Sequence, residues 1–297
     1  MTDAPPADAP FAASTVLALL RAAERRLAGA GLPEPRREAV RVYASVVGTS
    51  PSAVWLARRE PAPPEAAVRL ARAVERRATG APVAYAVGTA AFRTLELTVD
   101  ARVLIPRPET EGLVERVLAW AARTDRWGLA ADIGTGSGCI ALSLAVEGRF
   151  ARIVATDHSP DALAVAGENL RSVVPATPVE LREGDLLWAL GARPMDVIVS
   201  NPPYVTVEEW ERLEPGVRDH EPRLALVGGP DGLRHTEALL RAARGALRPG
   251  GLLALEVDCR RAAQTHALAC GLGWRAARLE EDLFGRPRYL LATREDE

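Results

Sequence analysis

Residues 129–146 read Leu-Ala-Ala-Asp-Ile-Gly-Thr-Gly-Ser-Gly-Cys-Ile-Ala-Leu-Ser-Leu-Ala-Val, and this stretch decides the fold. It begins as the apolar run of a buried strand and ends as a helix. The glycines between them, Gly134, Gly136 and Gly138, permit a tight turn and let a ligand approach the backbone. A strand that turns through glycines into a helix predicts a ligand-binding unit of the α/β class.

Strands and helices alternate along the rest of the chain. Apolar runs bounded by turn residues predict strands over residues 129–133, 152–157, 179–181, 196–199, 251–257, 275–279 and 288–292. Helical spacing predicts helices over residues 139–146, 160–170, 236–247 and 262–272. Because parallel neighbouring strands need a helical crossover, this alternation predicts an α/β, Rossmann-like fold with a mostly parallel seven-stranded sheet.

The N-terminal part of the chain has a different pattern, which predicts a second and smaller domain. Apolar residues recur at helical spacing over residues 14–28, 35–47 and 64–77. We therefore expect a small all-α bundle over residues 13–80, with Ser14 as the first N-cap and Val68 among the apolar positions. Residues 1–12 are rich in alanine, proline and aspartate, and they predict a disordered tail.

Between the helical region and the sheet, residues 81–104 predict a β-hairpin linker. Alternating apolar and polar residues over 95–99 indicate a half-buried strand, and a looser apolar run near residues 85–87 supplies its partner. Acidic residues in a first turn then predict a helix over residues 109–118. Residues 105–297 form the larger predicted domain.

The charges of the chain are unevenly distributed. All 37 basic residues are arginine, and with 39 acidic residues the net charge is −2, so we expect no stable binding to nucleic acid. Residues 13–80 carry twelve arginines against six glutamates, a net charge of +6, whereas residues 81–297 carry −6. The helical domain either meets an acidic partner or presents solvated faces in an arginine-rich chain.

The cysteines Cys139, Cys259 and Cys270 are scattered and follow no disulfide or metal-ligand spacing, so no metal is expected. Unpaired cysteines are typical of a reducing cytoplasm. The sequence also shows no signal peptide and no apolar run of about twenty residues. We therefore expect a soluble cytoplasmic protein without a membrane partner.

Asn201-Pro202-Pro203-Tyr204 follows the predicted strand 196–199, at the end where open α/β sheets bind ligands. Prolines have no N–H, so this loop offers carbonyl oxygens without competing donors. Asn201 adds an amide oxygen and an NH2 group, and Tyr204 adds a flat apolar face with a polar tip. Together these groups suit a planar amide or an exocyclic amine. The alternative is a tight turn after a strand.

Other strand ends carry residues that suit a nucleoside cofactor. Asp157 ends the second strand, where a carboxylate can hold a ribose diol, as in proteins that bind NAD. S-adenosylmethionine is favoured because the loop lacks the G-x-G-x-x-G spacing, and because Asp185 ends the third strand, where it suits an adenine amine. Asp132, at the base of the loop, suits a cationic ligand. Parallel strand ends share one edge, so Gly134, Asp157, Asp185 and Asn201 bring cofactor and acceptor amine together.

The stretch Asp-Ile-Gly-Thr-Gly-Ser-Gly, combined with Asn-Pro-Pro-Tyr, resembles class I methyltransferases that act on nitrogen. The chain is similar over nearly its whole length to the release-factor glutamine methyltransferase (HemK/PrmC) family. Residues 104–111, Leu-Ile-Pro-Arg-Pro-Glu-Thr-Glu, make this resemblance specific, because Asn-Pro-Pro-Tyr alone also suits adenine-N6 methyltransferases. Further similar segments lie at residues 82–88, 217–226, 228–232 and 282–288.

The resemblance implies transfer of a methyl group from S-adenosylmethionine to the side-chain nitrogen (N5) of the glutamine in the Gly-Gly-Gln motif of class I peptide chain release factors. It implies these cofactor-binding residues: Gly134, Thr135, Gly136, Ser137, Gly138, Asp157, Asp185, Leu186 and Asn201. It implies these substrate-binding residues: Asn201, Pro202, Pro203 and Tyr204. Residues 105–297 are then the catalytic domain, residues 13–80 dock the release factor, and a monomer is expected.

An amide nitrogen is a poor nucleophile, because its lone pair is delocalised into the carbonyl. We hypothesise that the catalytic residues are Asn201, Pro202 and Tyr204. The Asn201 side-chain oxygen and the Pro202 carbonyl accept the two amide N–H bonds, and Tyr204 packs against the amide plane. The rivals are adenine-N6 methylation of nucleic acid, which the negative catalytic half disfavours, glutamine methylation of another translation protein, and a scaffold without catalysis.

Two stretches depart from the family pattern. Residues 93–94 are Arg-Thr where the family usually has an aromatic residue, and this difference is expected to alter the wall of the substrate channel. Residues 257–259, Val-Asp-Cys, replace a glycine-containing stretch after the fifth strand. Three acidic residues either line the site, holding Arg107 or the substrate glycines, or form salt bridges between domains: Glu109, Glu111 and Glu221.

Overall fold

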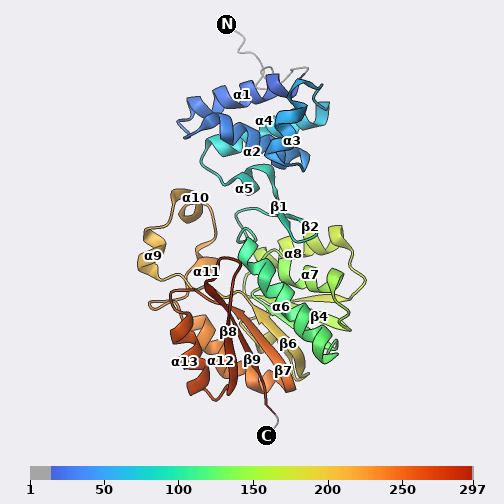
Figure 1. The fold of residues 1–297 in the computed structure, drawn as a ribbon, viewed down its shortest axis with the longest axis vertical. Coiled ribbons are helices and arrows are strands. Elements are labelled where there is room, and N and C mark those ends of the chain that lie inside the picture. The colour runs from blue at the N-terminus through green and yellow to red at the C-terminus, as the bar shows by residue number, and fades with distance from the viewer. Residues whose placement is uncertain (1–14, 296–297) are drawn as a thin grey trace. The chain divides into compact units, whose positions relative to one another are not determined.

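The computed structural model describes residues 15–295, whose contacts divide into two compact units. The first unit comprises the residues up to Thr89 together with Glu214–His220. The second comprises Ala90–Leu213 and the residues from Glu221 onward. The elements of both units are labelled in Figure 1.

The first unit is helical. It contains α1 (Val16–Gly29), α2 (Pro35–Val47), α3 (Pro51–Leu56), η2 (Ala57–Arg59), α4 (Pro64–Ala78), α5 (Val83–Val87) and α10 (Pro215–Arg218). Fully buried leucines and valines of α1, α2 and α4 form its apolar core. The predicted tail of residues 1–12 lies outside the described residues. Three predicted domain limits stay predictions: residues 13–80, 81–104 and 105–297.

Two details of the helical unit differ from the sequence-based expectation. The hydroxyl that caps α1 belongs to Thr15 and accepts from the Ala18 N–H, so the predicted cap at Ser14, which lies outside the described residues, was wrong. Val68 is 53% exposed, so its prediction as a core position was wrong. It lies two residues before Leu70 and therefore on the opposite side of α4 from the buried stripe.

The hairpin lies slightly later in the chain than expected. Its strands are β1 (Thr89–Phe92) and β2 (Leu95–Thr98), whereas the predicted strand near residues 85–87 is the helix α5. Apolar residues at the two ends of α5 lie four positions apart and pack on the helical core, which favours a helix over a strand. Gly88 ends α5 in the left-handed conformation with φ 91°.

The second unit is built on a seven-stranded sheet with the order β5-β4-β3-β6-β7-β9-β8. Its strands are β3 (Leu129–Ile133), β4 (Arg152–Asp157), β5 (Val179–Glu183), β6 (Met195–Ser200), β7 (Leu247–Glu256), β8 (Ala276–Glu281) and β9 (Pro287–Thr293). The strands from β5 to β7 are parallel, and β9 runs antiparallel to both of its neighbours. The predicted mostly parallel, seven-stranded sheet is confirmed.

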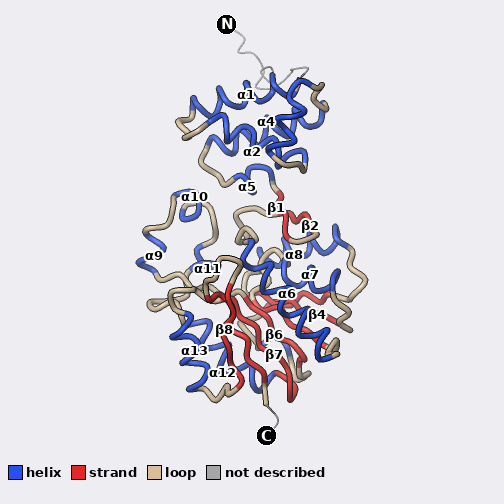
Figure 2. The backbone as a smooth tube through the Cα atoms, in the orientation of Figure 1, coloured by secondary structure: helices blue, strands red, loops and turns tan. Residues whose placement is uncertain are grey.

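Helices cover both faces of this sheet, as Figure 2 shows. One face packs against α6 (Pro108–Thr124) and α7 (Cys139–Glu147), with α8 (Pro160–Val173) beside them. The other face packs against η3 (Trp188–Leu190), α12 (Arg234–Ala246) and α13 (Ala262–Gly271). Neighbouring residues of β6 alternate between the two cores, since Val197 and Val199 join the first and Ile198 the second.

A long connection runs from β6 to α12 and contains short helices that the sequence did not predict. They are α9 (Val207–Glu211), α10 and α11 (Arg223–Leu226). Helix α9 begins with a capping box, in which Thr206 accepts from the Glu209 N–H and Glu209 accepts from the Thr206 N–H. This connection starts with Asn201 and therefore belongs to the candidate site.

Candidate active site

The carboxyl ends of the central strands meet at one edge of the sheet. In the strand register, Ile133 lies between Thr156 and Ser200, and Ser200 lies beside Leu255. Four neighbouring residues therefore end or follow these strands: Gly134, Asp157, Asn201 and Glu256. Because β3 and β6 are neighbours although β4 and β5 intervene in the chain, this edge is a topological switch point, where open α/β sheets bind ligands.

The glycine loop after β3 presents bare backbone to open space. Gly134, Gly136 and Gly138 have φ values of 73°, 54° and 83°, a region that other residues rarely adopt. A Cβ atom on Gly134 or Gly136 would meet no atom within 4 Å. The N–H groups of Gly134 and Thr135 donate to the Thr156 carbonyl at 2.9 and 2.8 Å, which ties the loop to β4. The backbone here is held in place and accessible to a ligand.

The side chains of the loop turn inward instead. Thr135 and Ser137 are buried, and the Thr135 hydroxyl donates to Asp132 Oδ2 at 2.6 Å. The same oxygen accepts from the Ala141 N–H at 3.1 Å, so Asp132 joins the loop to α7. Burial raises the pKa of the Asp132 carboxyl to about 7. Asp132 Oδ1 is buried and accepts no hydrogen bond from residues 15–295.

Asp157 and Asp185 lie at this edge in different environments. Asp157 Oδ2 accepts from the Gly136 N–H and Oδ1 accepts from the Ser159 N–H, both at 2.9 Å. The carboxylate therefore braces the glycine loop from β4. Asp185 is exposed beyond the end of β5, and Leu186 after it has a positive φ of 48°. This puts an exposed carboxylate on the same edge as the loop.

The Asn-Pro-Pro-Tyr loop is held by close backbone packing. The Val205 N–H donates to the Leu226 carbonyl, and the Gly228 N–H donates to the Val205 carbonyl. A Cβ atom on Gly228 would approach the Pro203 carbonyl oxygen to under 3.0 Å, and one on Gly232 would approach the Tyr204 carbonyl oxygen equally closely. These two glycines are required for the fit, because a side chain at either position would displace the loop.

The Asn201 side chain is part of a buried polar chain. Its NH2 group donates to Thr110 Oγ1 at 3.1 Å, and the Thr110 hydroxyl donates to Glu256 Oε2 at 2.7 Å. The Asn201 side-chain oxygen accepts no hydrogen bond from the described part of the chain. The structure thus places Asn201 beside two residues from α6 and β7.

Tyr204 and Arg288 lie near the same carboxyl group. Burial and the charge of Glu256 raise the pKa of Tyr204, so its hydroxyl is neutral. Arg288 is 9% exposed, and its charge interacts with Tyr204 and Glu256. Its Nε lies 3.7 Å from Asp282 Oδ2 and makes no hydrogen bond with residues 15–295. A neutral phenol and a buried guanidinium thus lie beside the Glu256 carboxyl at this wall of the site.

The acidic candidates have structural partners within the second unit. Glu221 accepts from Arg107 Nη2 at 2.5 Å and from the Ile105 N–H at 3.2 Å. Of the alternatives that the sequence left open, it therefore fulfils the one in which it holds Arg107. Glu111 accepts from the Arg93 N–H at 3.0 Å. Glu109 Oε1 lies 3.8 Å from Arg286 Nη2. These contacts stabilise the segment that carries Thr110.

Both departures from the family pattern have a structural explanation. The Arg93 side chain makes two hydrogen bonds to Glu147 of α7, at 2.7 and 2.6 Å, and one to the Glu111 carbonyl of α6. It therefore anchors the hairpin turn to both helices. Asp258 is buried and pairs with Arg260 and Arg261, and both arginines also pair with Glu209 of α9. Asp258 thus links the end of β7 to the connection after β6.

Comparison with known proteins gives matches along nearly the whole chain. The model of the PrmC N-terminal domain matches residues 18–88, and that of the methyltransferase small domain matches residues 114–213. The chain is 42% identical over 273 residues to the release factor glutamine methyltransferase of Cereibacter sphaeroides, covering 92% of this chain and 96% of the relative. It is 42% identical over 284 residues to that of Moorella thermoacetica, covering 95% and 100%.

The chain belongs to the release factor glutamine methyltransferase family. The resemblance found in the sequence is thereby confirmed, and the protein is a methyltransferase. A methyltransferase from Pyrococcus furiosus has a similar fold, with a TM-score of 0.52 and 20% identity over 68% of this chain and 90% of the other. The predicted class I methyltransferase fold with an N-terminal helical region is confirmed.

In this member of the release factor glutamine methyltransferase family, sequence reasoning missed part of the site. Glu256 ends an apolar strand, as Asp157 does, and this signal marks it as a residue of the carboxyl edge. Thr110 was quoted only as part of a motif. Gly228 and Gly232 were likewise quoted without a role, because a close approach to a distant carbonyl leaves no local pattern.

Proposed function

We propose that this protein transfers a methyl group from S-adenosylmethionine to N5 of the glutamine in the Gly-Gly-Gln motif of class I peptide chain release factors. The family supports the reaction, since its members are named for this substrate and reaction. The observation that carries the proposal is the side-chain oxygen of Asn201, which accepts no hydrogen bond from residues 15–295 and lies beside the open glycine loop. An acceptor for an amide and a backbone cradle for a cofactor thus lie at one switch point.

The residues of the glycine loop fit S-adenosylmethionine. Gly134 and Gly136 leave the backbone bare, in the space that a side chain would otherwise fill. Asp157, Asp185 and the buried Asp132 surround the loop with carboxylates, which suits a sulfonium and ammonium ligand better than a pyrophosphate. When bound, the cofactor supplies an electrophilic methyl group on its sulfonium sulfur.

The catalytic contribution of the chain is the positioning of a weak nucleophile. The Asn201 side-chain oxygen and the Pro202 carbonyl accept the two N–H bonds of the substrate amide, and Tyr204 packs against its plane. This fixes the nitrogen and favours its pyramidalisation. Positioning of this kind supplies about 7–11 kcal/mol in favourable cases. One amide proton leaves to solvent as the new N–C bond forms, so no strong base is required beforehand.

Mass spectrometry tests the proposed function directly. The protein is incubated with methyl-labelled S-adenosylmethionine and a full-length release factor, beside a variant whose motif glutamine is replaced. We expect one added methyl group on that glutamine and none in the variant. Methylation elsewhere on the release factor, or on another protein, would contradict the proposed substrate. The fold and the family assignment would be unaffected.

Two rival substrates are less well supported. Adenine-N6 methylation of nucleic acid requires a basic groove, whereas residues 81–297 carry a net charge of −6. Neither adenine nor another translation protein occurs in the names of the relatives described above. A methyl group transferred to duplex DNA in the same assay would revive the first rival.

Asp157→Ala is expected to weaken S-adenosylmethionine binding by about 10-fold or more. The substitution removes the proposed ribose acceptor and the carboxylate that accepts from the Gly136 and Ser159 N–H groups, and a hydrogen bond to a charged group contributes about 1.5–3 kcal/mol. Isothermal titration calorimetry measures the effect. Asp161→Ala, an exposed carboxylate in the first turn of α8, is the matched control. Equal affinities in both variants would refute the ribose assignment.

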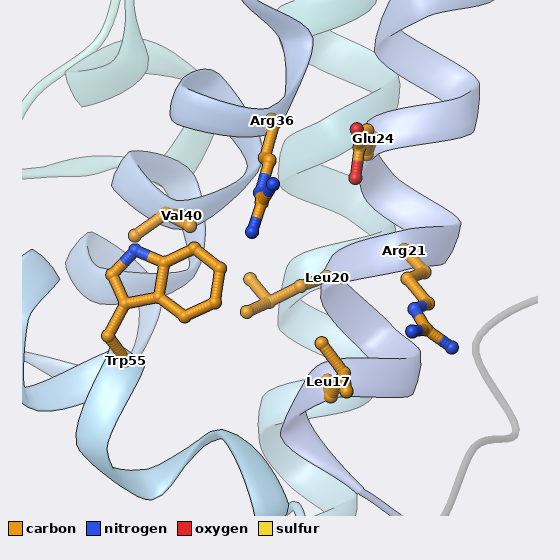
Figure 3. A pocket seen from close by; sticks show the side chains of 7 residues that line it. All are labelled: Leu17, Leu20, Arg21, Glu24, Arg36, Val40 and Trp55. Carbon is orange, nitrogen blue, oxygen red and sulfur yellow. The ribbon is translucent and has the colours of Figure 1, made fainter.

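We infer that the helical unit docks the release factor. It carries a net charge of +6 over residues 13–80 and has a cavity of about 180 Å³ lined by α1, α2 and α3. Figure 3 shows the Leu20 side chain extending from α1 toward Trp55 and Arg36. The Arg36 guanidinium carbon lies 4.8 Å from the centre of the Trp55 ring. Stacked arginine and tryptophan side chains are frequent anchors in protein interfaces.

Trp55→Ala is expected to raise KM for a full-length release factor by about 10-fold, because truncating an interface aromatic costs about 1–2 kcal/mol or more. KM for a short Gly-Gly-Gln peptide should stay unchanged, since a peptide of this length engages only the catalytic domain. Val68→Ala, an exposed position of α4 outside the cavity, is the control. Equal changes for both substrates would contradict docking.

The setting of the reaction follows from its substrate. We infer a monomer that acts in the cytoplasm, where release factors work in translation. Among residues 15–295, no helix combines the length and apolarity needed to cross a membrane. Sedimentation of the purified protein would reveal a dimer, and fractionation of cells would reveal another location.

A further inference from the structure

The hydrogen bonds from Asn201 to Glu256 connect three separate elements. Asn201 follows β6, Thr110 lies in the first turn of α6, and Glu256 ends β7. Thr110 is 2% exposed and Glu256 is 1% exposed, so water does not compete for these hydrogen bonds. A buried carboxylate in such a place needs partners. The Thr110 hydroxyl donates to it, and the Tyr204 hydroxyl is a second hydrogen-bond partner.

The chain of hydrogen bonds has a direction, because the number of hydrogens is limited. A carboxylate only accepts, so the single hydroxyl hydrogen of Thr110 is committed to Glu256. Thr110 Oγ1 is then left as an acceptor, and its partner must be the NH2 end of Asn201. Turning the Asn201 amide over would set two acceptor oxygens against each other at a buried place.

We propose that Thr110 and Glu256 are positioning residues, which hold the Asn201 amide with its oxygen facing the N–H bonds of the substrate. This inference rests on the proposed function, in which that oxygen accepts from the glutamine amide. If the Asn201 amide turned over, its NH2 group would face the NH2 group of the substrate. Two donors would then oppose each other and the substrate nitrogen would lose its position.

The direction of the hydrogen bonds from Asn201 through Thr110 to Glu256 depends on the ionisation of the Glu256 carboxyl. Burial raises the pKa of its carboxyl to about 7, while the hydrogen bonds of Thr110 and Tyr204 and the charge of Arg288 act in the opposite direction. Below this pH the protonated carboxyl donates to Thr110, which frees the Thr110 hydrogen to point at Asn201 and favours the opposite amide orientation. The other ionisable groups whose charge interacts with Glu256 are Glu109 on α6, Cys139 on α7, Tyr204 after β6 and Tyr289 on β9.

Thr110→Val and Thr110→Ser separate the hydroxyl from the shape of the side chain. Valine removes the hydroxyl at nearly constant volume, and we expect kcat to fall by about 10- to 100-fold, the cost of a misplaced reacting group. KM for the release factor and the cofactor affinity should change little. Serine keeps the hydroxyl and should restore most of kcat. Thr124→Val is the control, because this threonine lies at the exposed end of α6 and donates to the Trp120 carbonyl.

Glu256→Gln supplies a readout that a purely structural role would not change. With saturating cofactor, kcat of the wild type should fall as the pH drops below about 7. The glutamine variant keeps an acceptor oxygen and does not titrate, so this acidic limb should disappear. Saturation with cofactor removes any contribution of Asp132 through cofactor binding, although its pKa is also about 7.

Three outcomes would overturn the proposal. They are a Thr110→Val variant with wild-type kcat, a Thr110→Ser variant as impaired as Thr110→Val, and an acidic limb that persists in Glu256→Gln. If Thr110→Val does not fold, the serine variant and the pH profile of Glu256→Gln decide. A wild-type enzyme that methylates the glutamine with no effect of these variants refutes the positioning role alone. Absence of transfer by the wild type refutes the proposed function and this inference together.

Discussion

Replacing Asn201 with alanine is expected to reduce kcat for glutamine methylation by about 10²- to 10³-fold, the usual cost of removing one preorganised polar partner. The variant loses the side-chain oxygen that accepts a substrate N–H, while the Pro202 carbonyl remains. It also leaves Thr110 without its donor, although Thr110 still donates to Glu256. Steady-state kinetics with a full-length release factor measures the loss.

Affinity for S-adenosylmethionine serves as the internal control for Asn201→Ala. The glycine loop, Asp132 and Asp157 are bonded to one another and to β4, and none of these bonds uses the Asn201 side chain. Calorimetry should therefore give a Kd within about threefold of the wild-type value. This corresponds to a difference in binding free energy of less than about 1 kcal/mol. Retained turnover would remove Asn201 from the mechanism. A joint loss of cofactor affinity and turnover would instead assign Asn201 to the cofactor.

Replacing Gly228 with alanine is expected to reduce kcat by about 10²-fold without contacting the substrate. The new Cβ would lie under 3.0 Å from the carbonyl oxygen and carbon of Pro203, which are backbone atoms and have no alternative rotamer. The Pro-Pro-Tyr loop must therefore move, and a displacement of about 1 Å at a catalytic group costs about 10²-fold in rate. The strain also destabilises the fold by about 1–3 kcal/mol.

Kinetics and thermal unfolding of the same samples check the Gly228→Ala prediction. Gly245→Ala is the matched control, because a Cβ at this position in α12 meets no atom within 4 Å. A helical glycine replaced by alanine stabilises by about 0.5–1 kcal/mol, so this variant should be fully active and slightly more stable. If Gly228→Ala has wild-type kcat at a temperature where it is folded, its packing does not control the loop.

The elements that sequence reasoning located well are those with a strong local pattern. The apolar runs of β3 and β4 predicted both strands with the bounds that the structure has. Ser159 and Pro160 give α8 a capping hydroxyl and a fixed first φ, which determine where this helix begins. Patterns of this kind depend on neighbouring residues, so the surrounding fold does not alter them.

Short elements held by distant partners were missed. Helix α9 has five residues, too few to be stable alone. Its Glu209 pairs with Arg261, which follows the C-terminal end of β7. The segment 85–87 is apolar enough for a strand. It forms part of the helix α5, because Val83 and Val87 at the ends of this helix pack against the helical core. Only the surrounding structure distinguishes these outcomes.

The sequence by itself determined the class of fold, the loop that faces a cofactor and the Asn-Pro-Pro-Tyr receptor, because each is a local pattern at the end of a strand. The tertiary structure decided which residues hold that receptor in place. Thr110 lies 91 residues from Asn201 and 146 residues from Glu256 along the chain. These side chains meet because α6 packs over β7, and no local periodicity encodes hydrogen bonds between residues so far apart.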